Sequence, residues 1–252
     1  MRYALLVAYD GTHYGGWQIQ KNSVTVQEKL NNALKETLGR EAVITASGRT
    51  DSGVHAAAQV CHFDADTSIP AERFADALNF SLPDDICVLK SVAAPEGFDA
   101  TASAKRKTYC YRIYLSPRRS PLKDRYSVNV KYPVDTVKLQ TAGKMFEGKH
   151  DFKAYCAAGS QVKTTVRTVY SVVVKTSESR GSTDVEIYVT GNGFLYNMVR
   201  TLAGTMLYFA AGRIGKEDIS RSLENCDRNA VGKTMPAKGL TLESVDYGIN
   251  LF

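Results

Sequence analysis

Residues 47–56 contain the side chains with the clearest capacity for chemistry, in the order Ser-Gly-Arg-Thr-Asp-Ser-Gly-Val-His-Ala. Arg49, Asp51 and His55 bring a cation, a carboxylate and an imidazole into this short stretch. Thr-Asp-Ser-Gly alone is an ordinary turn sequence, in which the aspartate accepts bonds from nearby backbone amides. The segment nevertheless connects two expected buried strands, and loops held by such a scaffold commonly carry catalytic groups. A carboxylate there can attack carbon or remove a proton, and the sequence leaves both open.

A second segment, residues 104–131, is basic and rich in tyrosine. Its cations are Lys105, Arg106, Lys107, Arg112, Arg118, Arg119, Lys123, Arg125 and Lys131, with Asp124 as the single acid. Its tyrosines are Tyr109, Tyr111, Tyr114 and Tyr126. A solvated basic edge strand that blocks aggregation is one interpretation. The pattern favours RNA or DNA contact instead, because cations neutralise phosphates and aromatic faces stack on bases. We expect Lys105, Arg106, Lys107, Arg118 and Arg119 to contact the phosphate backbone.

Arg200 is the third candidate, because it enters a helix that is otherwise apolar as far as Arg213. Such a charge must reach water, a ligand or a buried acid. An arginine whose stem packs on the helix while its head reaches solvent fits equally well.

Cofactor and metal motifs are missing from the sequence. Its five cysteines include no Cys-x-x-Cys pair, and its four histidines form no His-Glu-x-x-His motif. Residues 232–234 end like a phosphate-binding loop, but Asp227 stands where the first glycine belongs. We therefore expect no metal, nucleotide or nicotinamide cofactor.

The composition predicts a soluble globular protein. The 252 residues are 44% hydrophobic and 23% charged, with a formal net charge of +6 that favours an anionic partner without requiring one. No apolar run approaches the roughly 20 residues that a membrane helix needs. The odd cysteine count and the absence of a secretory signal pattern predict a cytoplasmic protein.

Apolar periodicity and capping residues predict the elements that position these groups. In the first part, we expect strands at residues 3–9, 42–46, 59–63 and 86–93, and helices at 26–38 and 70–78. In the second, we expect strands at 108–115, 168–175, 184–190 and 240–247, and helices at 134–146, 196–210 and 217–223. This order predicts an α+β protein of two ferredoxin-like β-α-β-β-α-β units, with mainly antiparallel sheets and helices packed on one face. The predicted domains are residues 1–103 and 104–252.

The chain resembles the tRNA pseudouridine synthase A family. Residues 48–56 match that family's catalytic motif throughout. The likeness also includes 17–20, 109–111, 150–152, 194–200 and 236–240, in the family's order. Tyr155 replaces the usual phenylalanine, and Met235 replaces the small residue that usually precedes the proline. Both departures lie outside the catalytic motif, so they affect the shape of the pocket and not the chemistry.

The resemblance implies a cofactor-independent isomerase that converts uridine to pseudouridine in the tRNA anticodon stem-loop, at nucleotides 38, 39 and 40. It also implies a homodimer, with an active-site cleft between the two domains of each subunit. Asp51 would be the catalytic aspartate and Arg49 would hold the flipped nucleotide open. Tyr109 would stack on the uracil, Arg200 would pair with Asp51, and Leu240 would line the pocket.

Two other functions compete with this prediction. A non-catalytic RNA-binding protein would explain the composition and the basic strand, but not the complete Asp51 motif. A carbohydrate-active enzyme would need a second carboxylate to work with Asp51, and the sequence order places none beside it.

Overall fold

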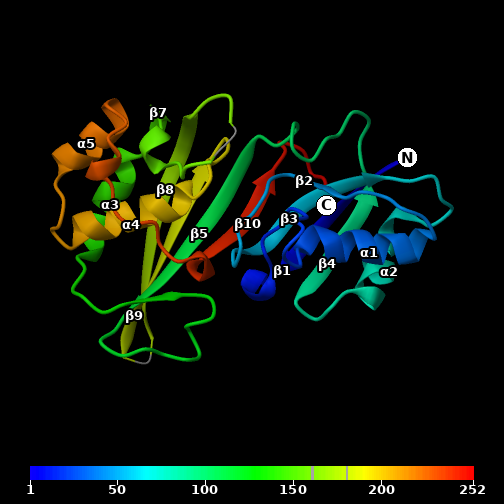
Figure 1. Cartoon of the computed structure of the whole chain (residues 1–252), viewed down its shortest axis with the longest axis horizontal. Coiled ribbons are helices and arrows are strands. Elements are labelled where there is room, and N and C mark those ends of the chain that lie inside the picture. The colour runs from blue at the N-terminus through cyan, green and yellow to red at the C-terminus, as the bar shows by residue number, and fades with distance from the viewer. Residues whose placement is uncertain (160–161, 180) are drawn as a thin grey trace. The chain divides into compact units, whose positions relative to one another are not determined.

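The chain divides into two units in the computed structural model, which describes residues 1–159, 162–179 and 181–252 (Figure 1). The first unit comprises Met1–Lys107 with Thr241–Phe252, and the second comprises Thr108–Leu240. The domain division at residues 103 and 104 stays a prediction. The last strand groups here with the first unit, because it pairs with a strand of that unit.

The first unit is built on an antiparallel sheet. Its strands are β1 (Arg2–Tyr9), β2 (Thr45–Ala46), β3 (His55–Asp64) and β4 (Ile86–Ala93). β1 lies between β3 and β4 and is antiparallel to both, with Leu5 opposite Cys61 on one side and Ser91 on the other. β2 pairs with the end of β3, while β10 (Leu240–Asp246) runs parallel to its start, with Thr241 opposite His55. The start of β3 follows the Asp51 loop, and it is paired with β1 on one side and with β10 on the other.

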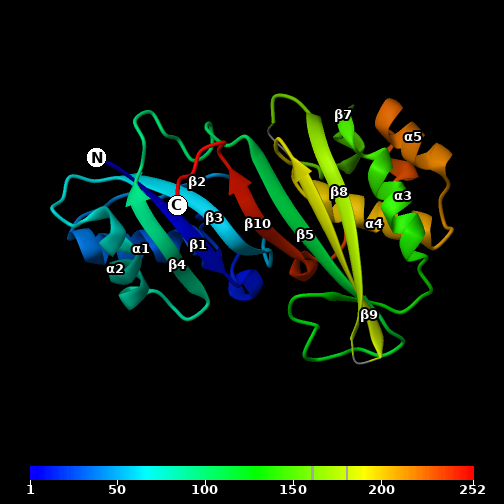
Figure 2. The ribbon, with the colours of Figure 1, turned by 180° about the vertical axis from the view of Figure 1, so that it is seen from behind.

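Helices α1 (Val26–Leu38) and α2 (Phe74–Ser81) cover one face of this sheet, and Figure 2 shows the strands from the opposite side. Thr25 and Glu28 form a reciprocal capping box at the start of α1, and Gly39 ends the helix in the left-handed conformation. Leu30 and Phe74 are completely buried against the sheet. The periodicity that predicted the helix at 26–38 is therefore confirmed.

The strands of the second unit follow one another in the order β5-β9-β8-β7. Its strands are β5 (Arg106–Leu115), β6 (Val128–Val130), β7 (Gly148–Asp151), β8 (Val166–Ser179) and β9 (Ser182–Gly191). β8 is antiparallel to β7 and to β9, with Val172 opposite Val189, and β6 runs parallel to the end of β5.

Three helices accompany this sheet: α3 (Thr136–Met145), α4 (Met198–Ala210) and α5 (Lys216–Glu224). α3 packs on β8 and α4, and Leu139, Val172 and Met206 are fully buried in that core. α4 is buried along nearly its whole length, so the apolar character of residues 201–212 reflects the core.

The predicted α+β class with mostly antiparallel sheets is confirmed, and the ferredoxin-like description of each unit stays a prediction. The strand expected at 42–46 is shorter than predicted, because α1 side chains occupy the backbone of Ile44. Its N–H donates to Asn31 and its carbonyl accepts from Gln27. The sequence analysis missed β6 and β7, which are too short or too polar to show alternation.

The buried His62 in the first unit should make the folding stability depend on pH. His62 on β3 accepts the Ala100 N–H through Nδ1 at 3.1 Å. Burial and the nearby Arg2 charge lower the pKa of His62 below its usual 6.5, outweighing the opposing Asp99 and Asp64 charges. The unfolded chain therefore binds this proton more readily, and folding stability should fall as the pH drops below about 6.5. His62→Gln should flatten this dependence in urea unfolding followed by circular dichroism between pH 5 and 7.5. An unchanged slope would contradict it.

Candidate active site

Asp51 lies on the loop between β2 and β3, and main-chain bonds hold this loop on both flanks. The Ser47 N–H donates to Val60 at 2.7 Å, and the Val54 N–H closes a turn by donating to the Asp51 carbonyl at 3.1 Å. From the segment after β1, the Trp17 N–H donates to the Thr50 carbonyl at 3.0 Å. The backbone that carries the carboxylate is therefore tied to the sheet and to the preceding segment.

Buried side chains of the first unit also support the Asp51 loop. The hydroxyls of Tyr9 and Thr50 are 2.8 Å apart in the interior, and Trp17 is almost completely buried beside Tyr9. Gly16 has a φ of +95°, and a Cβ built there would lie 2.6 Å from the Thr50 carbonyl oxygen. Only glycine permits this close approach of the backbone, so Gly16 belongs to the construction of the loop.

His55, the imidazole of the motif, is buried at the start of β3. Its Nδ1 lies 3.0 Å from Asp10 Oδ1 and 3.1 Å from the Gly11 amide nitrogen. These contacts tie the end of β1 to the loop. His55 therefore serves as an anchor, which the sequence analysis did not distinguish from a reactive group.

The two other charged side chains of the motif are Arg49 and Asp51. Arg49 is exposed and Asp51 is half-buried. Main-chain bonds thus fix the backbone that carries an exposed guanidinium and a half-buried carboxylate.

The second unit contributes an aromatic pair. Tyr109 on β5 is buried, and its ring meets that of Phe194 edge to face, with the centroids 5.3 Å apart. Phe194 thus restricts the orientation of the Tyr109 ring. The sequence analysis noted Phe194 within a matching segment but gave it no role.

Arg200 lies in the first turn of α4, where its guanidinium is fixed by two acceptors. Nε donates to the Met235 carbonyl at 2.7 Å, and Nη1 donates to Asn197 Oδ1 at 2.5 Å. Asn197 adopts a left-handed conformation at the start of the helix. The Met235 N–H returns a bond to the Arg200 carbonyl at 3.2 Å.

The segment at 232–240 is laid along α4 and β5. A Cβ on Gly204 of α4 would lie within bonding distance of the Lys233 carbonyl, so the helix needs a glycine there. The Tyr111 hydroxyl donates to the Pro236 carbonyl at 2.7 Å. Burial raises the pKa of Tyr111, although the nearby Arg200 charge opposes this. The segment leads to Leu240, which is buried at the start of β10.

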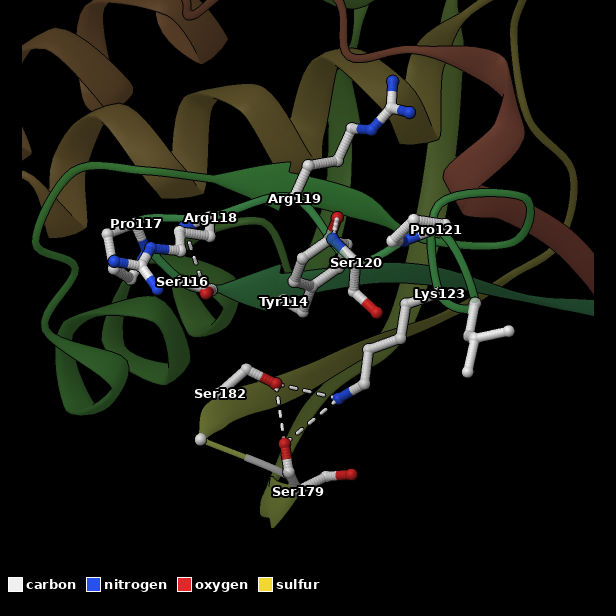
Figure 3. Close-up of a pocket in the computed structure, with 12 residues that line it drawn as sticks. Tyr114, Ser116, Pro117, Arg118, Arg119, Ser120, Pro121, Lys123, Ser179 and Ser182 are labelled. Carbon is white, nitrogen blue, oxygen red and sulfur yellow. Dashed lines mark hydrogen bonds between the residues drawn. The ribbon is translucent and has the colours of Figure 1, made fainter.

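The predicted phosphate contacts divide by exposure. Lys105, Arg106, Arg118 and Arg119 are exposed, whereas Lys107 is half-buried with its ammonium against the Ser47 carbonyl. Arg118 and Arg119 line a pocket of about 890 Å³ in the second unit (Figure 3). Lys123 in the same pocket is engaged by Ser182 at 2.8 Å and by both oxygens of Asp184. The charge of Lys123 is thus already compensated.

Within each unit, the structure groups residues that the sequence analysis proposed. Arg49 and Asp51 share one loop of the first unit, and Tyr109, Arg200 and Leu240 belong to the second. Gln59, which the sequence analysis missed, is fully buried and bridges Ser47 and Gly48. Its place between the apolar Ala58 and Val60 was the available signal. Among residues 1–159, 162–179 and 181–252, no three histidines, cysteines or carboxylates gather as metal ligands would. None of the helices in these ranges is long and apolar enough to cross a membrane.

A carboxylate on a loop held by main-chain bonds, with an arginine two residues before it, has the groups that acid–base or covalent chemistry requires. The family model described as tRNA pseudouridine synthase matches residues 5–101 and 142–248, and the chain belongs to that family.

Curated relatives are similar in sequence to this chain over nearly its full length. The tRNA pseudouridine synthase A of Ruminiclostridium cellulolyticum is 45% identical over 96% of this chain and 98% of its own. That of Halalkalibacterium halodurans is 43% identical over 95% and 90%, and that of Bacillus velezensis is 43% identical over 98% and 99%, respectively.

Proposed function

We propose that this protein isomerises uridine to pseudouridine in tRNA, with Asp51 as the catalytic residue. The observation that carries the proposal is the anchored Asp51 loop in a chain that belongs to the tRNA pseudouridine synthase family. The net charge of +6 and the exposed cations suit a polyanionic substrate.

The reaction breaks the N1–C1′ glycosidic bond, turns the retained uracil, and joins C5 to C1′. The hydrogen on C5 leaves as a proton and N1 gains one, so atoms balance without an oxidant or a water molecule. Asp51 would act either as the nucleophile that attacks carbon or as the base that removes the C2′ proton. Both routes require an ionised carboxylate in a fixed position. The main-chain bonds of the loop would hold Asp51 in that position.

The base must leave the helical stack before Asp51 can reach it, at a cost of a few kcal/mol. The exposed guanidinium of Arg49 would hold the flipped nucleotide open. Tyr109 would stack on the uracil, with its ring direction restricted by Phe194. Leu240 would line the pocket, and Arg200 would keep Asp51 ionised through charge-assisted hydrogen bonds.

The finer assignment follows the family. The proposed target is the anticodon stem-loop at nucleotides 38, 39 and 40, and the proposed working form is a cytoplasmic homodimer. Tritium release from tRNA labelled at uridine C5 tests the reaction directly, and mapping of pseudouridine in the product tests the positions. Absence of release on folded, unmodified tRNA would refute the isomerase. Tight tRNA binding in that case would indicate a non-catalytic RNA-binding protein.

Arg118 and Arg119 provide a test of RNA contact. Both are exposed, although Arg119 Nε lies 3.7 Å from Asp124. Replacing both by alanine should weaken tRNA binding and reduce the slope of log affinity against log salt by roughly 0.7–0.9 for each phosphate that is no longer neutralised. The measurement is a filter-binding titration at several salt concentrations.

Lys90→Ala combined with Lys138→Ala is the matched control, because it removes two exposed cations from β4 and α3. If both double variants change affinity and slope equally, residues 118 and 119 contribute only to the net charge.

A further inference from the structure

Lys107, near the start of β5, turns its ammonium inward instead of toward solvent. Nζ donates to the Ser47 carbonyl at 2.5 Å. Among the described residues, no carboxylate lies within 4 Å of Nζ, and Ser47 is its single hydrogen-bond acceptor. Ser47 opens the segment that leads through Arg49 to Asp51. Lys107 thus reaches the stem of the Asp51 loop.

The same stem is held by a second buried side chain. Gln59 Nε2 donates to the Gly48 carbonyl at 2.8 Å, and the Ser47 hydroxyl donates to Gln59 Oε1 at 2.6 Å. Ser47 and Gln59 are both completely buried. A Cβ on Gly48 would lie 2.8 Å from the Lys107 ammonium, so the absent side chain of Gly48 leaves room for the lysine. Two consecutive carbonyls of the loop are therefore fixed by side-chain donors.

An ammonium in this position opposes folding, because a half-buried charge without a counter-ion loses part of its hydration. Burial lowers the pKa of Lys107 to about 8. Arg49 and Asp51 follow on the same loop. Two further ionisable groups near the stem are Tyr247 after β10 and Cys61 on β3, and burial raises the pKa of both. Tyr247 and Cys61 therefore stay neutral near pH 8, where Lys107 is expected to change its charge.

We propose that Lys107 is a positioning residue for Asp51, which it aligns through the Ser47 carbonyl, and is not a contact to the tRNA backbone. The inference rests on the proposed isomerase function. A phosphate contact would require an ammonium that faces solvent, whereas Lys107 is less exposed than the neighbouring Lys105 and Arg106.

Lys107→Met, which keeps most of the unbranched stem and removes the donor, tests the proposal. We expect the single-turnover rate on pre-bound tRNA to fall about 10²-fold, since a small displacement of a catalytic group costs that much. Affinity for tRNA and its salt slope should stay within about twofold, as for displacements that spare phosphate contacts. Lys107→Arg keeps a charged donor and should recover most of the rate. Thermal unfolding of each variant confirms that the fold is intact.

A pH series gives a second, independent measurement. The bound-state rate of the unmodified protein should decline as the pH is raised through about 8, and Lys107→Arg should lack this decline because arginine stays charged. The proposal is overturned if Lys107→Met keeps the full bound-state rate, or if it instead loses affinity with a shallower salt slope. It is also overturned if the pH profiles of the unmodified protein and Lys107→Arg coincide. If the unmodified protein forms no pseudouridine, the proposed function is refuted, and this outcome is distinct from a failure of the Lys107 predictions.

Discussion

Replacing Asp51 by asparagine should abolish pseudouridine formation while leaving tRNA binding close to that of the unmodified protein. The amide has nearly the same shape, but it is neither a useful nucleophile nor a base. We expect the rate on bound tRNA to fall by about 10⁴-fold or more, the upper end of what a positioned acid–base group contributes. The loop should persist, because main-chain groups of Asp51 and its neighbours make the bonds to Trp17 and Val54.

Single-turnover tritium release with excess enzyme is the measurement, since it separates chemistry from binding. Asp66→Asn is the matched control, because it makes the same chemical change at an exposed position of the first unit. Asp51→Ala is needed as well, since an asparagine followed by serine can deamidate and restore the carboxylate. Turnover near the unmodified rate in Asp51→Ala would remove Asp51 from the mechanism.

The parts of the fold that follow local rules could be predicted from the sequence. The capping box at Thr25, the apolar repeat and the terminal Gly39 define α1 to the residue. The strand predicted at 86–93 is β4 with the same bounds. The capping and apolar repeat of α1 and the alternation of β4 can be recognised within one segment, although β4 takes its strand hydrogen bonds from β1.

Long-range pairings could not be predicted in this way. The parallel alignment of β10 with the start of β3 joins Thr241 to His55, which are far apart in the chain. The paths of irregular segments could not be predicted either. The path of residues 232–236 along α4 depends on the missing side chain of Gly204 and on bonds to Arg200 and Tyr111.

The candidate site divides in the same manner. The types and spacing of Arg49 and Asp51 identify the loop, but they do not show that His55 lies buried behind it. Lys107 belonged to a basic cluster by composition, although strand alternation places it on the same side of β5 as the buried Tyr109 and Tyr111. Charge density alone does not show that the Lys107 ammonium donates to the Ser47 carbonyl, and its predicted contact with the RNA backbone stays a prediction.

Replacing Arg200 by methionine should lower the rate of the chemical step by about 10²–10³-fold, the loss typical of removing one preorganised electrostatic contact, with little change in tRNA affinity. Methionine preserves the apolar stem and removes only the guanidinium. The segment beside it should stay in place, because the Met235 N–H still donates to the main chain of residue 200 and Tyr111 still holds Pro236.

The loss is expected because the family resemblance implies that Arg200 keeps Asp51 ionised. A neighbouring guanidinium favours the charged carboxylate, and a neutral Asp51 could neither attack carbon nor accept a proton. If the two residues act as one unit, adding Arg200→Met to Asp51→Asn should cost almost nothing further. Arg221→Met on α5 is the control, since it removes an exposed guanidinium from the same unit. Should Arg200→Met weaken tRNA binding and leave the bound-state rate intact, Arg200 is a phosphate contact, and its bonds to Met235 and Asn197 serve to aim it at RNA.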